Sequence, residues 1–207
     1  MEYGLDLSCL SVGSYKELLR KQNLLPGRRI LLQDIDLNFD IIENCGIENV
    51  LQLKKALSTS QKIASFASKH ALSEEYLMIL KREIGSLEQK SVPLSDFPSM
   101  DTAFISYLNG IGIKTSKDYY NSSQTEKDEL FCLCDLVRIN GVGAIAARAF
   151  YESGYTSVSE IAGADAAEML QKVSEINGIR QYYKANLGVK DMQFCIDFAS
   201  LLMRFCN

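Results

Sequence analysis

Apolar residues recur every three or four positions along most of the chain, and this spacing predicts amphipathic helices. The clearest case is residues 73–87, where Tyr76, Leu80 and Ile84 share one face and Ser73 precedes them as a candidate N-cap. A stripe of apolar residues at 191–205 predicts a last helix that docks on the rest of the protein. Further helices are predicted at residues 14–25, 60–69, 102–108 and 164–176, with a short one beginning at Ser157.

Cap and turn residues mark where some of these helices begin and end. Ser14, followed three residues later by Glu17, has the pattern of a capping box, so the first helix is expected to begin there. Residues 30–57 keep a helical period that is broken at residues 44–47, where Asn-Cys-Gly indicates a helix C-cap. Two helices joined by a glycine turn are therefore expected in this region.

One segment has the composition of a domain boundary. Residues 88–99 contain two of the three prolines of the chain, set among polar residues. We therefore predict an N-terminal half at residues 1–92 and a C-terminal half at residues 93–207.

The most distinctive stretch is residues 136–148, in which a Gly-Val-Gly corner separates two apolar runs. Leu136 and Ile139 lie three positions apart on one helical face. Gly141 and Gly143 permit a tight turn, and the alanine-rich run after them suits a closely packed second helix. This order of features predicts a helix-hairpin-helix.

The segment after this corner has two relatives elsewhere in the chain. At Gly46, Gly112 and Gly154 a glycine closes a helix and leads into a short helix with its own N-cap. We infer three related units at unequal spacing, a degenerate one in the N-terminal half and two in the C-terminal half, of which only the last keeps the two-glycine corner. The predicted fold is all-α, with tandem helix-hairpin-helix-like (SAM-like) units and a C-terminal docking helix.

Composition supports the helical fold and limits the possible partners. Trp is absent, Pro occurs three times, and helix-forming residues dominate. The chain has 22 Lys and Arg against 26 Asp and Glu, a net charge of −4, which argues against a generally basic surface. Any contact with nucleic acid is therefore expected to be local.

Cysteine and histidine usage predicts neither a metal site nor a disulfide framework. The six cysteines include no Cys-x-x-Cys pair, and the single histidine, His70, falls in a predicted loop. The N-terminus lacks the basic start and apolar core of a signal peptide, and no apolar run approaches the roughly 20 residues of a membrane helix. We predict a cytoplasmic protein with reduced thiols that does not enter a membrane.

The sequence contains no recognisable catalytic constellation. It has no Gly-x-Ser-x-Gly, P-loop or His-Glu-x-x-His motif, and its acidic pairs stand in polar settings typical of helix starts and turns. We therefore predict a non-catalytic protein without a cofactor. Tyr182 and Tyr183, flanked by Arg180 and Lys184, are candidates for stacking on bases, with a partly buried connector before the last helix as the alternative.

Residues 135–143 and 154–162 together resemble helix-hairpin-helix domains, in particular the bacterial family called domain of unknown function 4332. The likeness extends to residues 25–31 and 77–84 and so over most of the chain. It implies an all-helical fold related to the helix-hairpin-helix modules of repair and recombination proteins. It brings no established activity.

In helix-hairpin-helix modules that bind nucleic acid, the glycine corner exposes backbone N–H groups to a phosphate at the start of the second helix. The resemblance therefore implies a phosphate cradle, with contacts to the nucleic-acid backbone that are independent of base sequence. The candidate residues of the cradle are Asn140, Gly141, Val142 and Gly143, with Arg138 and Arg148 as nearby cations.

The chain departs from the DNA-binding pattern immediately after the corner. Ala144, Ile145 and Ala146 stand where such modules commonly carry Lys or Arg, and the first cation is Arg148. Two functions are therefore expected. One is DNA binding without sequence specificity through residues 139–143, and the alternative is a protein-interaction scaffold that uses the same fold without binding nucleic acid.

Overall fold

The computed structural model describes residues 3–22, 24–122 and 128–205. Within these ranges the chain forms helices and no strand, apart from two isolated backbone bridges, Ser11 with Asn49 and Pro93 with Thr115. The prediction of an all-α fold is confirmed.

The chain divides into two compact units, each of which is described by itself. The N-terminal unit contains Asp6–Glu88, and the C-terminal unit contains the residues from Gln89 onward together with the segment at residues 3–5. The division falls at the start of the proline-containing segment. Tyr3 joins the C-terminal unit because its hydroxyl bonds Ser116 Oγ at 2.6 Å and its carbonyl accepts from Arg138.

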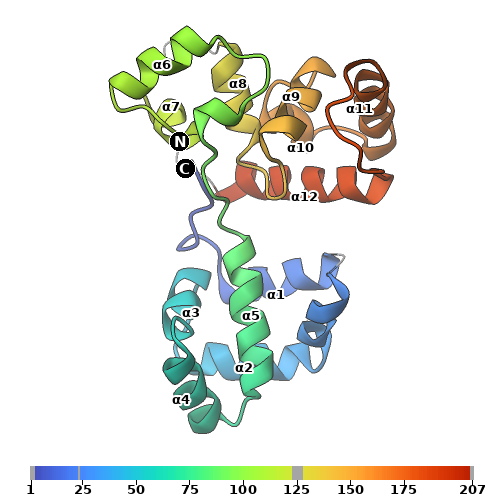
Figure 1. Ribbon diagram of the computed structural model, residues 1–207. Coiled ribbons are helices and arrows are strands. Elements are labelled where there is room, and N and C mark those ends of the chain that lie inside the picture. Colours follow the sequence, from blue (N-terminus) through green and yellow to red (C-terminus); the bar gives the residue numbers. More distant parts are fainter. Residues whose placement is uncertain (1–2, 23, 123–127, 206–207) are drawn as a thin grey trace. The chain divides into compact units, whose positions relative to one another are not determined.

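The N-terminal unit is built around α5 (Glu74–Ser86), which packs against η1 (Pro26–Leu32), α3 (Val50–Ala56) and α4 (Ser60–His70). Its core is formed by side chains that are fully buried, among them Leu19, Phe39, Ile42, Leu53, Leu77 and Leu80. In Figure 1 the unit comprises α1 (Val12–Lys21), η1 (Pro26–Leu32), α2 (Ile35–Asn44), α3 (Val50–Ala56), α4 (Ser60–His70) and α5 (Glu74–Ser86).

In the C-terminal unit the last helix, α12, runs alongside α10 and α11 (Figure 1). The apolar stripe predicted for this helix is buried at Met192, Ile196, Ala199 and Leu202. The described elements are η2 (Leu94–Asp96), α6 (Thr102–Gly110), α7 (Ser116–Asn121), α8 (Glu129–Leu136), α9 (Ala144–Glu152), α10 (Val158–Ala162), α11 (Ala166–Arg180) and α12 (Val189–Phe205).

The helix starts predicted at residues 60, 73, 102 and 157 agree with the structure to within one residue, and those predicted at residues 14, 164 and 191 each differ by two residues. Ser73 and Ser157 cap α5 and α10 through their side chains, as expected. The capping box predicted at Ser14 is wrong, because α1 begins earlier and is capped by Ser11, whose side chain accepts from the Ser14 amide. Glu17 instead pairs with Arg20 at 2.9 Å. Two serines three residues apart offered the same cap, and packing of buried Val12 selects the first.

The break predicted at residues 44–47 is confirmed, but the prediction that His70 falls in a loop is wrong. Cys45 is the C-cap of α2, and Gly46 follows with a φ of +79°. His70 is the last residue of α4 and not part of a loop, because the helix continues to an αL residue at Ala71.

The three glycine turns inferred from the sequence share one local geometry. Gly46, Gly112 and Gly154 have φ values of +79°, +91° and +91°, a region that L side chains rarely adopt. In each turn an apolar residue follows the glycine, and two positions later a polar side chain caps the next short helix. The capping residues are Asn49, Thr115 and Ser157. The same turn therefore occurs once in the N-terminal unit and twice in the C-terminal unit.

No helix among the described residues is long and apolar enough to cross a membrane. No disulfide joins any two of the five cysteines in the described ranges, and Cys206 lies outside those ranges. Within the same ranges, no three His, Cys, Asp or Glu side chains gather closely enough to hold a metal ion.

Candidate nucleic-acid interface

The Gly-Val-Gly corner forms a tight turn between α8 and α9. Its two apolar residues, Ile139 and Val142, are buried, and the Val142 amide donates to the Ile139 carbonyl at 3.0 Å. Between them Gly141 has a φ of +84°, which a side chain would strain. The apolar pair anchors the turn in the core, so that Gly141 and Gly143 are exposed at its tip.

The start of α9 is open. Gly143 is the N-cap and supplies no side-chain hydrogen bond, and the first turn of the helix contains no acidic residue. A Cβ placed on Gly143 would meet no atom within 4 Å, so the protein leaves room beside this glycine. Asn140 is half-exposed beside them. The amides at this end carry the partial positive charge of the helix dipole.

The rim of this opening is apolar. Ile145, in the first turn of α9, is 47% exposed, and Phe194 of α12 is 41% exposed. The Phe194 ring approaches within 3.7 Å of the point where a Cβ on Gly141 would stand. The surroundings of the opening therefore favour a ligand that is held by shape and by backbone contacts over one that is held by ion pairs.

Arg138 lies in the interior. It is 3% exposed and forms an ion pair with Asp135. Its Nε donates to the Tyr3 carbonyl at 2.8 Å, its Nη1 donates to the Tyr120 hydroxyl at 2.8 Å, and the guanidinium lies 4.6 Å from the centre of the Tyr120 ring. These contacts fasten the residue before the corner to the segment at residues 3–5 and to α7.

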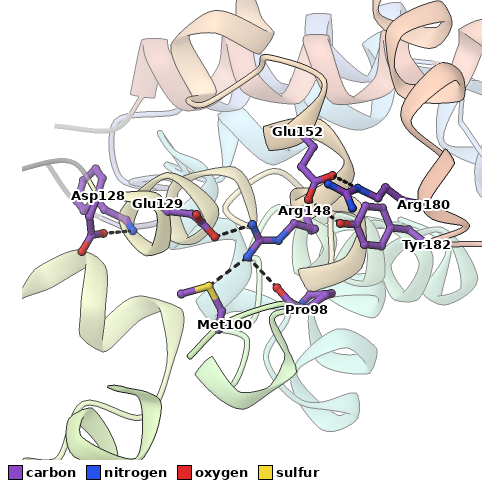
Figure 2. A network of polar contacts seen from close by, with 9 residues as sticks. Pro98, Met100, Asp128, Glu129, Arg148, Glu152, Arg180 and Tyr182 are labelled. Atoms are coloured by element: carbon purple, nitrogen blue, oxygen red, sulfur yellow. Dashed lines mark hydrogen bonds and ion pairs between the residues drawn. The ribbon is translucent and has the colours of Figure 1, made fainter. Parts of the chain in front are cut away.

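Arg148 is buried to the same degree and ties α9 to two other segments. Figure 2 shows its guanidinium between Glu129, at the start of α8, and the segment at residues 98–100. Nη1 lies 2.6 Å from Glu129 Oε1, and Nη2 donates to the Pro98 carbonyl at 2.7 Å. Arg148 Nε is buried and has no hydrogen-bond partner in the described part of the chain.

One turn further along α9, Glu152 joins two more segments to the helix (Figure 2). Its carboxylate accepts from the Tyr182 hydroxyl at 2.7 Å and from Arg180 Nε at 3.0 Å. The hydrogen bond from Tyr182 and the nearby Arg180 guanidinium lower the pKa of Glu152, against a smaller opposing effect of burial. Of the candidates for base stacking, Tyr182 and Arg180 are engaged with this carboxylate.

Residues 98–196 match the family model described as Domain of unknown function (DUF4332). The search of curated proteins found no match to the chain. The search of solved structures found none either.

The DUF4332 match begins just before α6 and ends within α12, so it includes the corner and all six candidate residues and leaves the N-terminal unit outside. Four of the six, residues 140–143, form one continuous turn. The other two, Arg138 and Arg148, are buried and each pairs with a carboxylate of α8. A role for the six residues in binding phosphate stays a prediction.

Two acidic partners within the DUF4332 region were not identified from the sequence. Asp135 stands three positions before Arg138, a spacing that brings side chains together on a helix and was available as an indication. Glu129 lies nineteen positions before Arg148, and no local pattern connects them. Long-range pairs of this kind depend on how α8 and α9 pack.

Proposed function

We propose that this protein is a non-catalytic binding module that contacts the phosphate backbone of DNA through the corner at residues 139–143, without reading base sequence. The observation that carries the proposal is the start of α9, where no side chain caps the first amides and there is room beside the N-cap Gly143. Amides at a helix N-terminus favour an anion, because they donate hydrogen bonds and carry the positive end of the dipole. The absence of acidic residues from the first turn of α9 supports the same conclusion.

In this proposal Arg138 and Arg148 position the corner and do not touch the ligand. Both are 3% exposed and hold carboxylates or carbonyls of the C-terminal unit. Because the salt dependence of DNA binding reflects the cations that neutralise phosphates, we expect a shallow dependence, with a slope of log K against log salt no steeper than about −1 to −2. We also expect weak binding, with a Kd of about 10⁻⁴ M at moderate salt.

The second candidate function is a protein-interaction scaffold, and a different surface favours it. Three large apolar side chains stand at helical spacing on and just after α6. They are Phe104, Tyr107 and Ile111, which are 36%, 62% and 56% exposed. Large apolar side chains gathered on one exposed helix face are typical of surfaces that bind other proteins. In this alternative the corner serves only to pack α8 against α9.

The experiment is a titration of labelled duplex and single-stranded DNA with the full chain, followed by fluorescence anisotropy at about 20 mM and about 150 mM salt. The test variant is Gly143→Glu, which places a carboxylate in the open space before α9 without a backbone clash, since Gly143 has a φ of −89°. We expect it to abolish binding.

The matched control is Gly178→Glu on α11, which adds the same charge at an exposed position with no atom within 4 Å of the new Cβ. It should lower the affinity only slightly through the change in net charge. DNA binding is rejected if the wild-type chain fails to bind at the lower salt, and that result favours the protein-interaction scaffold. If the two glutamate variants weaken binding equally, the corner at residues 139–143 is rejected as the binding site.

A further inference from the structure

The only histidine of the sequence lies beside a cysteine in the N-terminal unit. Cys45 Sγ is 3.1 Å from His70 Nδ1, and it donates to the Ile41 carbonyl at 3.0 Å. Cys45 caps the C-terminus of α2 and His70 ends α4, so the packing of the unit brings together two residues that are 25 positions apart. The His70 ring is held by Phe66, whose ring centre is 4.6 Å away.

A thiol next to an imidazole has a nearby base for its proton, and the thiolate is the reactive form of cysteine. Rotation about the Cβ–Sγ bond turns the thiol hydrogen from the Ile41 carbonyl toward His70 Nδ1. The imidazolium that results stands at the C-terminal end of α4, where the helix dipole favours a positive charge, and this charge offsets the C-terminal end of α2, where the dipole disfavours the Cys45 thiolate. Both residues are half-exposed, so a small reagent reaches them.

Three of the other described thiols, those of Cys9, Cys134 and Cys195, stand in less favourable surroundings. Cys9 is exposed, but its Sγ lies 3.2 Å from a carboxylate oxygen of Asp6, which repels a thiolate. Burial, the largest cause, raises the pKa of Cys195 to about 12, and burial also raises the pKa of Cys134. Cys132 is half-exposed on α8, in the other unit.

We propose that Cys45 is a site of modification by low-molecular-weight disulfides, with His70 as the base. The Cys45 proton passes to His70 Nδ1, and the thiolate sulfur attacks one sulfur of the disulfide. The new Cys45 S–S bond forms as the old S–S bond breaks, and the departing thiolate takes the proton from the imidazolium. Cys45 is oxidised to a mixed disulfide, and one thiol of the reagent is released.

The test is the reaction of the reduced full-length chain with oxidised glutathione at neutral pH, in a Cys206→Ser background. Peptide mass spectrometry gives the rate at each cysteine. We expect Cys45 to react about tenfold faster than Cys9, although Cys9 is the more exposed of the two. Replacing His70 with Gln should slow the reaction of Cys45 with glutathione disulfide by a similar factor and leave the rate of the reaction at Cys9 unchanged.

Lys69→Gln is the matched control, because it changes the neighbouring exposed residue of α4 and leaves the imidazole in place. It should preserve the rate at Cys45, and circular dichroism should show that both variants are folded. The proposal is overturned if Cys9 or Cys132 reacts before Cys45 in the wild-type chain, a result that requires no variant. It is equally overturned if His70→Gln leaves the rate at Cys45 unchanged.

Discussion

The glycine turns before α3 and α7 differ from the one before α10 in how the short helix is fastened to the rest of its unit. Before α3, the Val50 amide donates to the Leu10 carbonyl at 2.9 Å. Before α7, the Ser116 amide donates to the Val92 carbonyl at 2.7 Å. In both cases an extended segment lies beside the cap residue and offers its backbone as the partner.

Before α10 a side chain takes the place of that backbone carbonyl. The Val158 amide donates to Asp135 Oδ2 at 2.7 Å, and the other carboxylate oxygen of Asp135 pairs with Arg138. A buried carboxylate is stable only when it is paired and hydrogen-bonded, so this turn requires the arginine. The comparison explains why the cation nearest the Gly-Val-Gly corner is internal: it neutralises the group that holds α10.

The largest expected effect comes from removing that carboxylate. Asp135→Ala leaves the Val158 amide and the Arg138 guanidinium without their buried partner, and we expect a loss of about 3–5 kcal/mol in the free energy of unfolding. Urea denaturation followed by circular dichroism measures it. The comparison variant is Asp118→Ala, which removes the exposed capping-box carboxylate in the first turn of α7 and should cost only about 1 kcal/mol.

A double variant sharpens this result. Asp135→Ala combined with Arg138→Met removes both charges, so it should be less destabilised than Asp135→Ala alone, because no uncompensated guanidinium remains. If the loss in the double variant equals the sum of the losses for Asp135→Ala and Arg138→Met measured separately, the pairing is contradicted. Equal losses for Asp135→Ala and Asp118→Ala would remove the distinction between the turns.

The second prediction concerns the other internal arginine. Arg148→Met should lower the free energy of unfolding by about 1–3 kcal/mol, because the Pro98 carbonyl loses its donor, while Glu129 is 45% exposed and is rehydrated. At temperatures where the variant is folded, its affinity for duplex DNA should equal that of the wild-type chain. A specific loss of DNA affinity without a loss of stability would assign Arg148 to the ligand instead.

The third prediction compares glycines within the C-terminal unit. Gly141→Ala and Gly154→Ala each force a side chain into a left-handed conformation, with φ values of +84° and +91°, and should each cost about 1–2 kcal/mol. Gly143→Ala should cost less than either of these, since its φ of −89° suits alanine and its surroundings are open, and what remains is the lower preference for alanine at an N-cap. Thermal unfolding of the three variants checks the order, and a Gly143→Ala variant that is as costly as the other two would contradict an unhindered Gly143.

The recurring turn could be predicted from sequence because its determinants are local. A glycine, an apolar residue and a capping side chain stand within four positions at residues 46–49, 112–115 and 154–157, so chain order alone identifies them. The buried arginines could not be predicted in the same way. The contact of Arg138 with the Tyr3 carbonyl spans 135 positions, and only tertiary packing decides whether an arginine beside a glycine corner faces solvent or the core.

The smallest expected effect concerns Glu152, which ties α9 to α11 and to the connector before α12. Its pKa is lowered in the folded protein, first by the hydrogen bond from Tyr182 and then by Arg180, relative to an ordinary value of 4.5. Its charge therefore adds stability above about pH 4.5, and this contribution is lost as the pH falls through the lower, folded-state pKa.

Glu152→Gln keeps an acceptor for Tyr182 and removes the charge, so it should cost about 0.5 kcal/mol at neutral pH, the scale of a partly exposed ion pair. Thermal midpoints of the wild-type chain and the variant, measured from neutral pH downward, should converge below about pH 4.5. A gap that stays constant over this range would mean that Glu152 acts by packing and not by charge. The ion pair of Glu152 would then contribute nothing to stability. In that case α9 would not be an example of a helix held by charged side chains, in contrast to the turns before α3 and α7, which are held by backbone hydrogen bonds.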